Sequence, residues 1–105
     1  MRDGEKLLSL LGMCRRASLA GFGHDASKKA LREGQARLCI VCEDAAPRLR
    51  EEFRALAEAA KVPLLELPIR AAQIKRAAQV PAVVVTINEK GLAKKIRECA
   101  EVEPM

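Results

Sequence analysis

The sequence predicts a layered α/β/α domain built around a mixed, largely parallel sheet, and two observations lead to this expectation. Apolar segments of strand length alternate with helix-like segments along the whole chain, and the segment at residues 83–87 is almost continuously apolar. Such alternation places helices on the faces of a sheet, and a continuous apolar strand is typical of a central strand covered on both faces. The length of 105 residues suits a single domain over residues 1–105.

The first half of the chain predicts two helices and two strands. Leucines at helical spacing predict a helix over about residues 3–16, and the short apolar stretch at 19–22 predicts a brief strand. Asp25 can cap a second helix, and Gly34 suits the position just after the end of that helix. A second strand is expected over about residues 37–42.

A long helix is expected to start at Pro47 and to end near residue 61, because proline is tolerated in a first helical turn. The acidic pair before it, Glu43 and Asp44, could act as paired carboxylates in acid–base chemistry, but we expect it to cap this helix. A third strand is expected at residues 63–67.

The last third of the chain predicts a helix, the apolar strand at residues 83–87 and a final helix. We expect the first of these helices over about residues 70–78, with Ile74 and Ala77 facing inward. Asn88 can cap the final helix, whose apolar residues again recur at helical spacing. The tail that begins at Glu101 is expected to fray.

The formal net charge of +5 suits a polyanionic partner such as nucleic acid. Phe22 and Phe53 are the only aromatic residues, so the chain cannot build the stacking platform on which RRM, OB-fold and cold-shock proteins hold bases. No apolar run approaches the ~20 residues that a membrane span needs. The N-terminus lacks the pattern of a signal peptide, so we expect a cytoplasmic protein without membrane contact.

The cysteine pair Cys39 and Cys42 has the spacing of a zinc or redox motif. The pair lies, however, in the second expected strand, where positions three apart point to opposite faces. We therefore expect reduced, metal-free cysteines that pack as small hydrophobic residues, with zinc or thiol chemistry as the alternative. His24 is the only histidine, and no nucleophile and base are paired, so we expect neither a catalytic site nor a cofactor.

The segment that starts at Gly23 predicts a glycine turn followed by a basic helix. A helix start offers unpaired backbone N–H groups and the positive end of the helix dipole to an anion. Lys28, Lys29 and Arg32 form one basic face of this helix, which either binds the RNA backbone or is an ordinary solvated face. His24 likewise either contacts RNA or is simply solvated, and Asp25 either caps the helix or reads a base.

Several segments, taken in order and with their spacing, resemble the YlxQ-like bacterial members of the L-seven-Ae ribosomal-protein family. This resemblance implies a three-layer α/β/α sandwich with a four-stranded mixed sheet and the binding of kink-turns in RNA. It covers nearly the whole chain. The matching segments are residues 10–17, 23–32, 36–45, 83–85 and 91–96.

The resemblance also implies which residues contact the RNA. The family's signature turn corresponds to residues 23–29, where Gly23 and Lys29 match, while Asp25 and Ala26 replace the asparagine and glutamate that read G·A pairs. Asp25 lacks an amide donor and Ala26 lacks a polar group, so we expect weak kink-turn specificity. The resemblance places a second contact in the aliphatic loop at residues 78–82. That loop contributes Val80 and Pro81, and Lys75 and Arg76 precede it as contacts to the RNA backbone.

The predicted function is therefore the recognition of structured RNA by a monomeric protein that is not an enzyme. Ribosomal RNA is the expected partner, with ribosomal proteins as a further class. The alternative is a protein-interaction module on the same fold, which docks to the ribosome or to another factor without reading RNA. The replaced residues Asp25 and Ala26 favour this alternative.

Overall fold

The structure, a computed structural model, describes residues 3–101 and contains nine helices and strands within that range. Their positions agree with the sequence prediction to within a few residues. The sequence predicts a frayed tail from Glu101 onward, and residues 102–105 of that tail lie outside the described residues. The elements are α1 (Gly4–Arg16), β1 (Ala20–Phe22), α2 (His24–Arg32), β2 (Leu38–Cys42), α3 (Pro47–Ala60), β3 (Leu64–Leu67), α4 (Ala71–Ala78), β4 (Val84–Ile87) and α5 (Lys90–Ala100).

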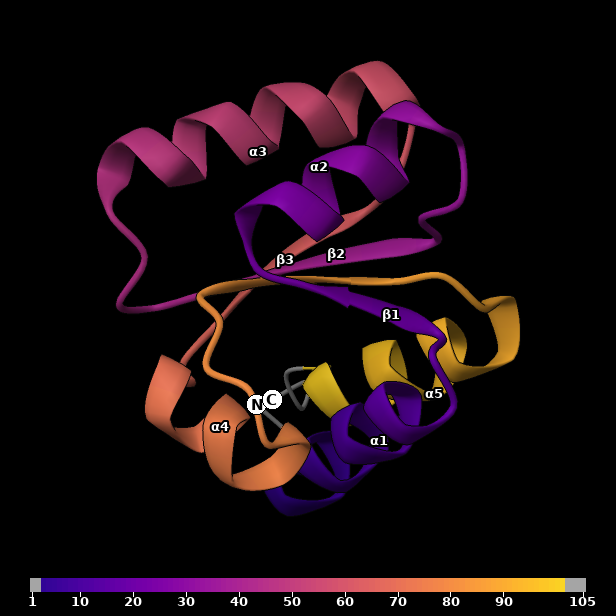
Figure 1. The fold of residues 1–105 in the computed structure, drawn as a ribbon, viewed down its shortest axis with the longest axis vertical. Helices are drawn as coiled ribbons and strands as arrows, with labels where there is room; N and C mark the ends of the chain where they lie inside the picture. Colours follow the sequence, from indigo (N-terminus) through magenta and orange to yellow (C-terminus); the bar gives the residue numbers. More distant parts are fainter. Residues whose placement is uncertain (1–2, 102–105) are drawn as a thin grey trace.

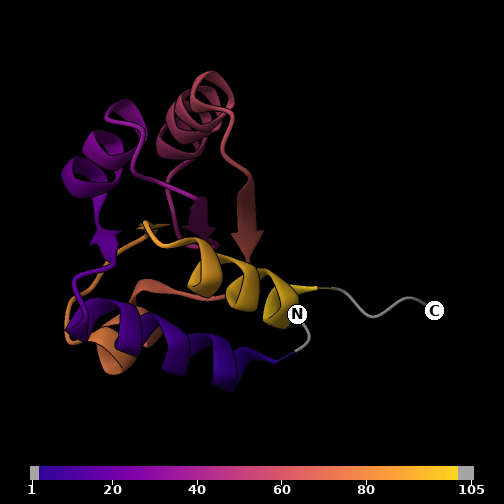
Figure 2. The ribbon, with the colours of Figure 1, turned by 90° about the vertical axis from the view of Figure 1, so that its right-hand side faces the viewer.

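These elements form three layers, as predicted. Helices α2 and α3 cover one face of the four-stranded sheet, and α1, α4 and α5 cover the other (Figure 1). Viewed from the side, β1 and β3 are the outer strands, and α2 and α3 lie next to each other above the sheet (Figure 2). Among residues 3–101, no helix is both long enough and apolar enough to cross a membrane.

The strand order is β1-β4-β2-β3, so β4 is central, as its apolar sequence predicts. The expectation of a largely parallel sheet is wrong: β4 is antiparallel to both β1 and β2, and only β2 and β3 are parallel. The chain leaves β3 and passes through α4, a helix of eight residues, to enter β4 at the same end of the sheet. Alternation of helices and strands therefore predicted the layers but not the strand directions.

The sheet separates two apolar cores. Cys39 and Val41 of β2 belong to the core under α2 and α3, whereas Ile40 and Cys42 belong to the core on the other face. The two cysteines thus point to opposite faces, as the strand prediction required. Burial raises the pKa of each of these thiols to about 12. Among the described residues, no group of three or more potential ligands could hold a metal ion.

The expected caps of α3 and α5 are wrong. Asp44 does not cap α3; its carboxylate accepts the backbone N–H of Ala71, at 3.1 and 3.2 Å, and so caps α4. Asn88 does not cap α5; that role falls to Glu89, which accepts the N–H groups of Gly91 and Leu92. Helix α3 begins at its proline without a side-chain cap. A cap depends on where the acidic side chain points in three dimensions, and its place in the sequence does not fix that.

Candidate functional site

The turn between β1 and α2 begins with Gly23, whose φ of 94° suits glycine far better than any other residue. Gly23 is the N-cap of α2, and because it has no side chain, the first turn of α2 has no side-chain cap. The expectation that Asp25 caps this helix is wrong, because Asp25 is already its second residue. The backbone N–H groups at this helix start therefore face outward without a capping oxygen, as an anion site requires.

The first turn of α2 lies directly on β1, because Gly21 leaves no side chain in the way. A Cβ at Gly21 would come within 2.9 Å of Thr86 Oγ1 and within 3.0 Å of the carbonyl oxygen of Ala26. The buried hydroxyl of Ser27 donates a hydrogen bond of 3.1 Å to the carbonyl of Gly21. This close contact fixes the position and direction of the α2 N-terminus on the sheet.

The segment at residues 79–83 meets the glycine turn at the same end of the sheet. It runs from the end of α4 up to β4 (Figure 1). There the backbone N–H of Gly23 donates a hydrogen bond of 2.9 Å to the carbonyl of Val84, the first residue of β4. Within the segment, Val80 packs partly against the core and Pro81 is exposed. The turn and the aliphatic loop, which are about 60 residues apart in sequence, are thus brought together.

Glu52 of α3 lies beside the basic face of α2 and was not identified from the sequence. Its carboxylate accepts a hydrogen bond of 2.8 Å from His24 Nε2 and is ion-paired with Lys28 Nζ at 3.3 Å. Hydrogen bonding to Glu52, and then to Asp25, raises the pKa of His24, and the bond from His24 lowers the pKa of Glu52. The His24 ring also packs edge-on against Phe53, with the ring centroids 5.5 Å apart.

The predicted cations of α2 therefore fall into two groups. His24 and Lys28 have a counter-ion supplied by the protein, whereas Lys29 and Arg32 are exposed. Within residues 3–101, no carboxylate is paired with either Lys29 or Arg32. These two side chains are the cations of α2 that remain available to an anionic ligand.

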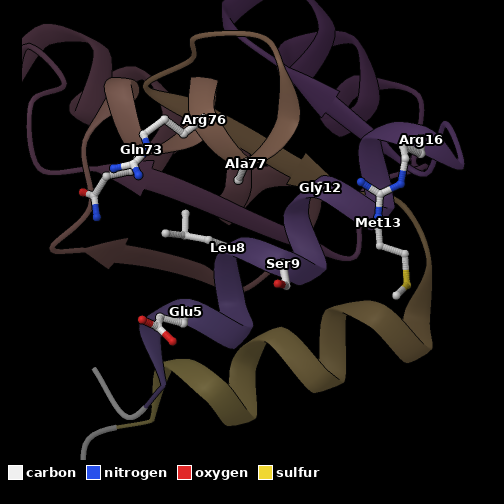
Figure 3. A pocket seen from close by; sticks show the side chains of 9 residues that line it. All are labelled: Glu5, Leu8, Ser9, Gly12, Met13, Arg16, Gln73, Arg76 and Ala77. Carbon is white, nitrogen blue, oxygen red and sulfur yellow. The ribbon is translucent and has the colours of Figure 1, made fainter.

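Lys75 and Arg76 lie on α4, on the face of the sheet opposite to α2 (Figure 1). Arg76 lines a groove between α1 and α4, together with Leu8, Arg16 and Gln73 (Figure 3). The structure thus brings together the glycine turn, the aliphatic loop and the basic face of α2, but it places Arg76 beside α1. The loop connects these two surfaces through Gln79, which ends α4 with a φ of 67°.

Comparison with known proteins assigns the chain to a family over most of its length. The model of the Ribosomal protein L7Ae/L30e/S12e/Gadd45 family matches residues 5–97. No curated protein sequence shows significant similarity to the chain.

Solved structures share the fold. A protein of unknown function from Bacillus halodurans superposes with a TM-score of 0.83 at 26% identity, covering 90% of this chain and 96% of that one. The Giardia lamblia 15.5kD RNA binding protein superposes with a TM-score of 0.75 at 23% identity, covering 91% of this chain and 82% of that one. Both agree with the observed α/β/α sandwich.

Proposed function

The chain belongs to the ribosomal protein L7Ae/L30e/S12e/Gadd45 family, and from this premise we propose that it binds structured RNA at the N-terminus of α2. The contacts are the backbone N–H groups after Gly23, the cations Lys29 and Arg32, and the aliphatic loop with Val80 and Pro81. The family description names the ribosomal proteins L7Ae, L30e and S12e, and the Giardia protein of the same fold is an RNA-binding protein. Both facts support RNA as the partner.

The observation that carries this proposal is the hydrogen bond between Gly23 and Val84. It holds an uncapped helix start beside the first residue of β4, which directly follows the loop with the exposed Pro81, so we infer that one ligand meets hydrogen-bond donors, cations and an apolar surface together. A phosphate fits the donors and cations, and an unstacked base fits the apolar surface. Structured RNA offers both within a short distance.

We extend the proposal to a single cytoplasmic domain over residues 1–105 that acts as a monomer on ribosomal RNA, with ribosomal proteins as neighbours. Discrimination between kink-turns and other folded RNA is expected to be modest. Asp25 offers a carboxylate that is already bonded to His24 at 3.2 Å, and Ala26 offers no polar side chain. Each lost hydrogen-bonding partner is worth about 1–3 kcal/mol of discrimination.

The test compares Lys29→Ala with Lys28→Ala in titrations of a ribosomal RNA fragment that contains a kink-turn. Lys29 is ion-paired with no described carboxylate, so its loss should weaken binding by about 1–3 kcal/mol, roughly 5- to 150-fold. Lys28 already pairs with Glu52, so its loss should cost clearly less. Thermal melts should show both variants folded.

Equal effects of the two substitutions, or none, would place the RNA surface elsewhere. A wild-type protein that binds no RNA at low salt would favour the second candidate function, a protein-interaction module. The pairing of His24 and Lys28 with Glu52, which reduces the positive charge at the turn, is the observation that favours this second candidate.

A further inference from the structure

A second basic surface lies along α5, a helix that begins at the end of the sheet opposite the glycine turn (Figure 1). A groove there is lined by Arg37, which precedes β2, and by Lys90, Lys94 and Arg97 of α5. All four side chains are exposed. The spacing of the three α5 residues places them along one side of the helix. We call this surface the α5 groove.

The cations of the α5 groove have no counter-ion among residues 3–101. In the described part of the chain, none of the four is ion-paired with a carboxylate. The opposite holds on the outer side of α3, where Arg54 is ion-paired with Glu51 at 2.9 Å and with Glu66 at 2.8 Å. Positive charge that is paired inside the protein contributes little to attracting a polyanion, whereas unpaired charge acts fully.

Among the described residues that line the α5 groove, one has a carboxylate, Glu89, and it has a structural role. Glu89 accepts hydrogen bonds from the N–H groups of Gly91, at 2.9 Å, and Leu92, at 2.6 Å. These bonds lower the pKa of Glu89 and hold its oxygens against the helix start. Four cations therefore face the solvent around one carboxylate, which leaves the groove strongly positive.

We propose that the α5 groove binds the phosphate backbone of a second stretch of the same RNA that the α2 turn binds. This inference rests on the proposed function, since it presumes that RNA is the partner. Lysines and arginines on an open surface suit phosphates rather than base edges. The groove therefore adds affinity and orientation without sequence preference.

The position of the groove determines which RNA can use it. Gly23 is bonded to Val84 at one end of β4, whereas Arg37 donates its backbone N–H to Ile87 at the other end, at 2.7 Å. Strand β4 has four residues and is therefore about 10 Å long. An RNA that reaches both surfaces must extend beyond the α2 turn by at least this length, and a short RNA that ends at the turn occupies the α2 turn alone.

The test uses two RNAs, a short ribosomal RNA fragment with a kink-turn and the same fragment extended by a helical stem. The double variant Lys94→Ala with Arg97→Ala is compared with a matched control on α3, Arg48→Ala with Arg54→Ala, which loses the same charge. For the extended RNA, the α5 variant should bind about tenfold more weakly, and its log–log salt slope should flatten by roughly 1.4–1.8 for two lost phosphate contacts. For the short RNA, both variants should bind within about twofold of the wild type, and melting curves should confirm that both are folded.

Three outcomes would overturn the inference, and they are distinguishable. If the wild type binds both RNAs and the α5 variant matches it, the groove makes no contact and the α2 site stands. If the two double variants lose equal affinity for the extended RNA, only net charge matters. If the wild type binds neither RNA, the proposed function fails, and the inference fails with it.

Discussion

The two ends of β4 differ in which groups are paired within the protein, the backbone donors of the adjoining helix or the cations beside it. At one end, the first turn of α2 has no capping side chain, but His24 and Lys28 are paired with Glu52. At the other end, the first turn of α5 is capped by the carboxylate of Glu89, but within residues 3–101 none of the cations of the α5 groove is ion-paired. One helix start thus keeps its backbone donors open, and the other keeps its side-chain cations open.

This difference shows that the net charge of a small basic protein does not indicate where an anionic ligand binds. The pairing of individual donors and cations is more informative. Open backbone donors have a fixed direction, so the α2 turn suits one phosphate in one position. Unpaired lysines and arginines on flexible stems suit a run of phosphates in many positions. In the complex that we propose, the α2 end positions the RNA and the α5 end supplies general attraction.

The largest effect that tests this contrast is expected from Gly21→Ala. The new Cβ would press against Thr86 and the backbone of Ala26, so the start of α2 must move away from the sheet. We expect a loss of about 1–3 kcal/mol in the free energy of unfolding, measured by urea denaturation. Binding of the short RNA should fall as well, because the donors of the α2 turn are displaced.

The control for that variant is Gly34→Ala, at the far end of the same helix. Gly34 has a φ of 74°, so alanine there costs about 1 kcal/mol of backbone strain. This variant should lose stability while its RNA affinity stays at the wild-type level. If Gly21→Ala lowers the stability but leaves the affinity for the short RNA unchanged, RNA binding does not depend on the exact position of α2 on the sheet.

An increase in affinity is expected from Glu52→Gln, because this change releases Lys28 from its ion pair. The affinity for the short RNA should rise roughly three- to tenfold, and the salt slope should steepen by about 0.7–0.9 for one added phosphate contact. Glu51→Gln is the matched control, since Glu51 pairs with Arg54 and not with a residue of α2. Unchanged binding of Glu52→Gln would show that Lys28 does not face the RNA.

The smallest effect concerns pH. Because Glu52 and Asp25 raise the pKa of His24 in the folded protein, the charged imidazole stabilises the fold. This stabilisation is complete below the unfolded pKa of about 6.5 and disappears as the pH rises through the folded pKa. The difference in melting temperature between the wild type and His24→Gln should therefore shrink between pH 6 and pH 8. The effect is small because the side chain is 41% exposed, and a constant difference would contradict it.

Local sequence patterns predicted the layers, the element bounds and the central position of β4, because burial leaves a periodic trace in the sequence. Such local patterns could not predict helix caps, ion pairs or strand directions, because these depend on residues that are distant in the sequence. Asp44 caps a helix whose first residue is 27 positions away, and Glu52 bonds to His24 across 28 positions. The prediction of a largely parallel sheet was wrong for the same reason. The direction of β4 depends on the end of the sheet at which the connection from β3 enters it.

The candidate site was partly accessible from the sequence. The glycine turn and the basic helix could be located by residue type, and the family resemblance supplied the aliphatic loop. Nothing local indicated that Lys28 is ion-paired while Lys29 has no such pair within residues 3–101, since both follow the same helix start. The α5 groove was missed because Arg37 is separated by more than 50 residues from the lysines beside which it lies.

The division of the interior by the sheet gives the cysteines a use as reporters of motion. Cys39 lies under α2 and α3, and Cys14, Cys42 and Cys99 lie on the opposite side. All four thiols are buried, so a reagent in the solvent reaches each one only when the layer above it opens. While the layers are closed, burial raises the pKa of the Cys39 and Cys42 thiols to about 12, so both stay almost entirely protonated at neutral pH and react little. The rate at which each sulfur is labelled thus records separately how often the two halves of the sandwich come apart.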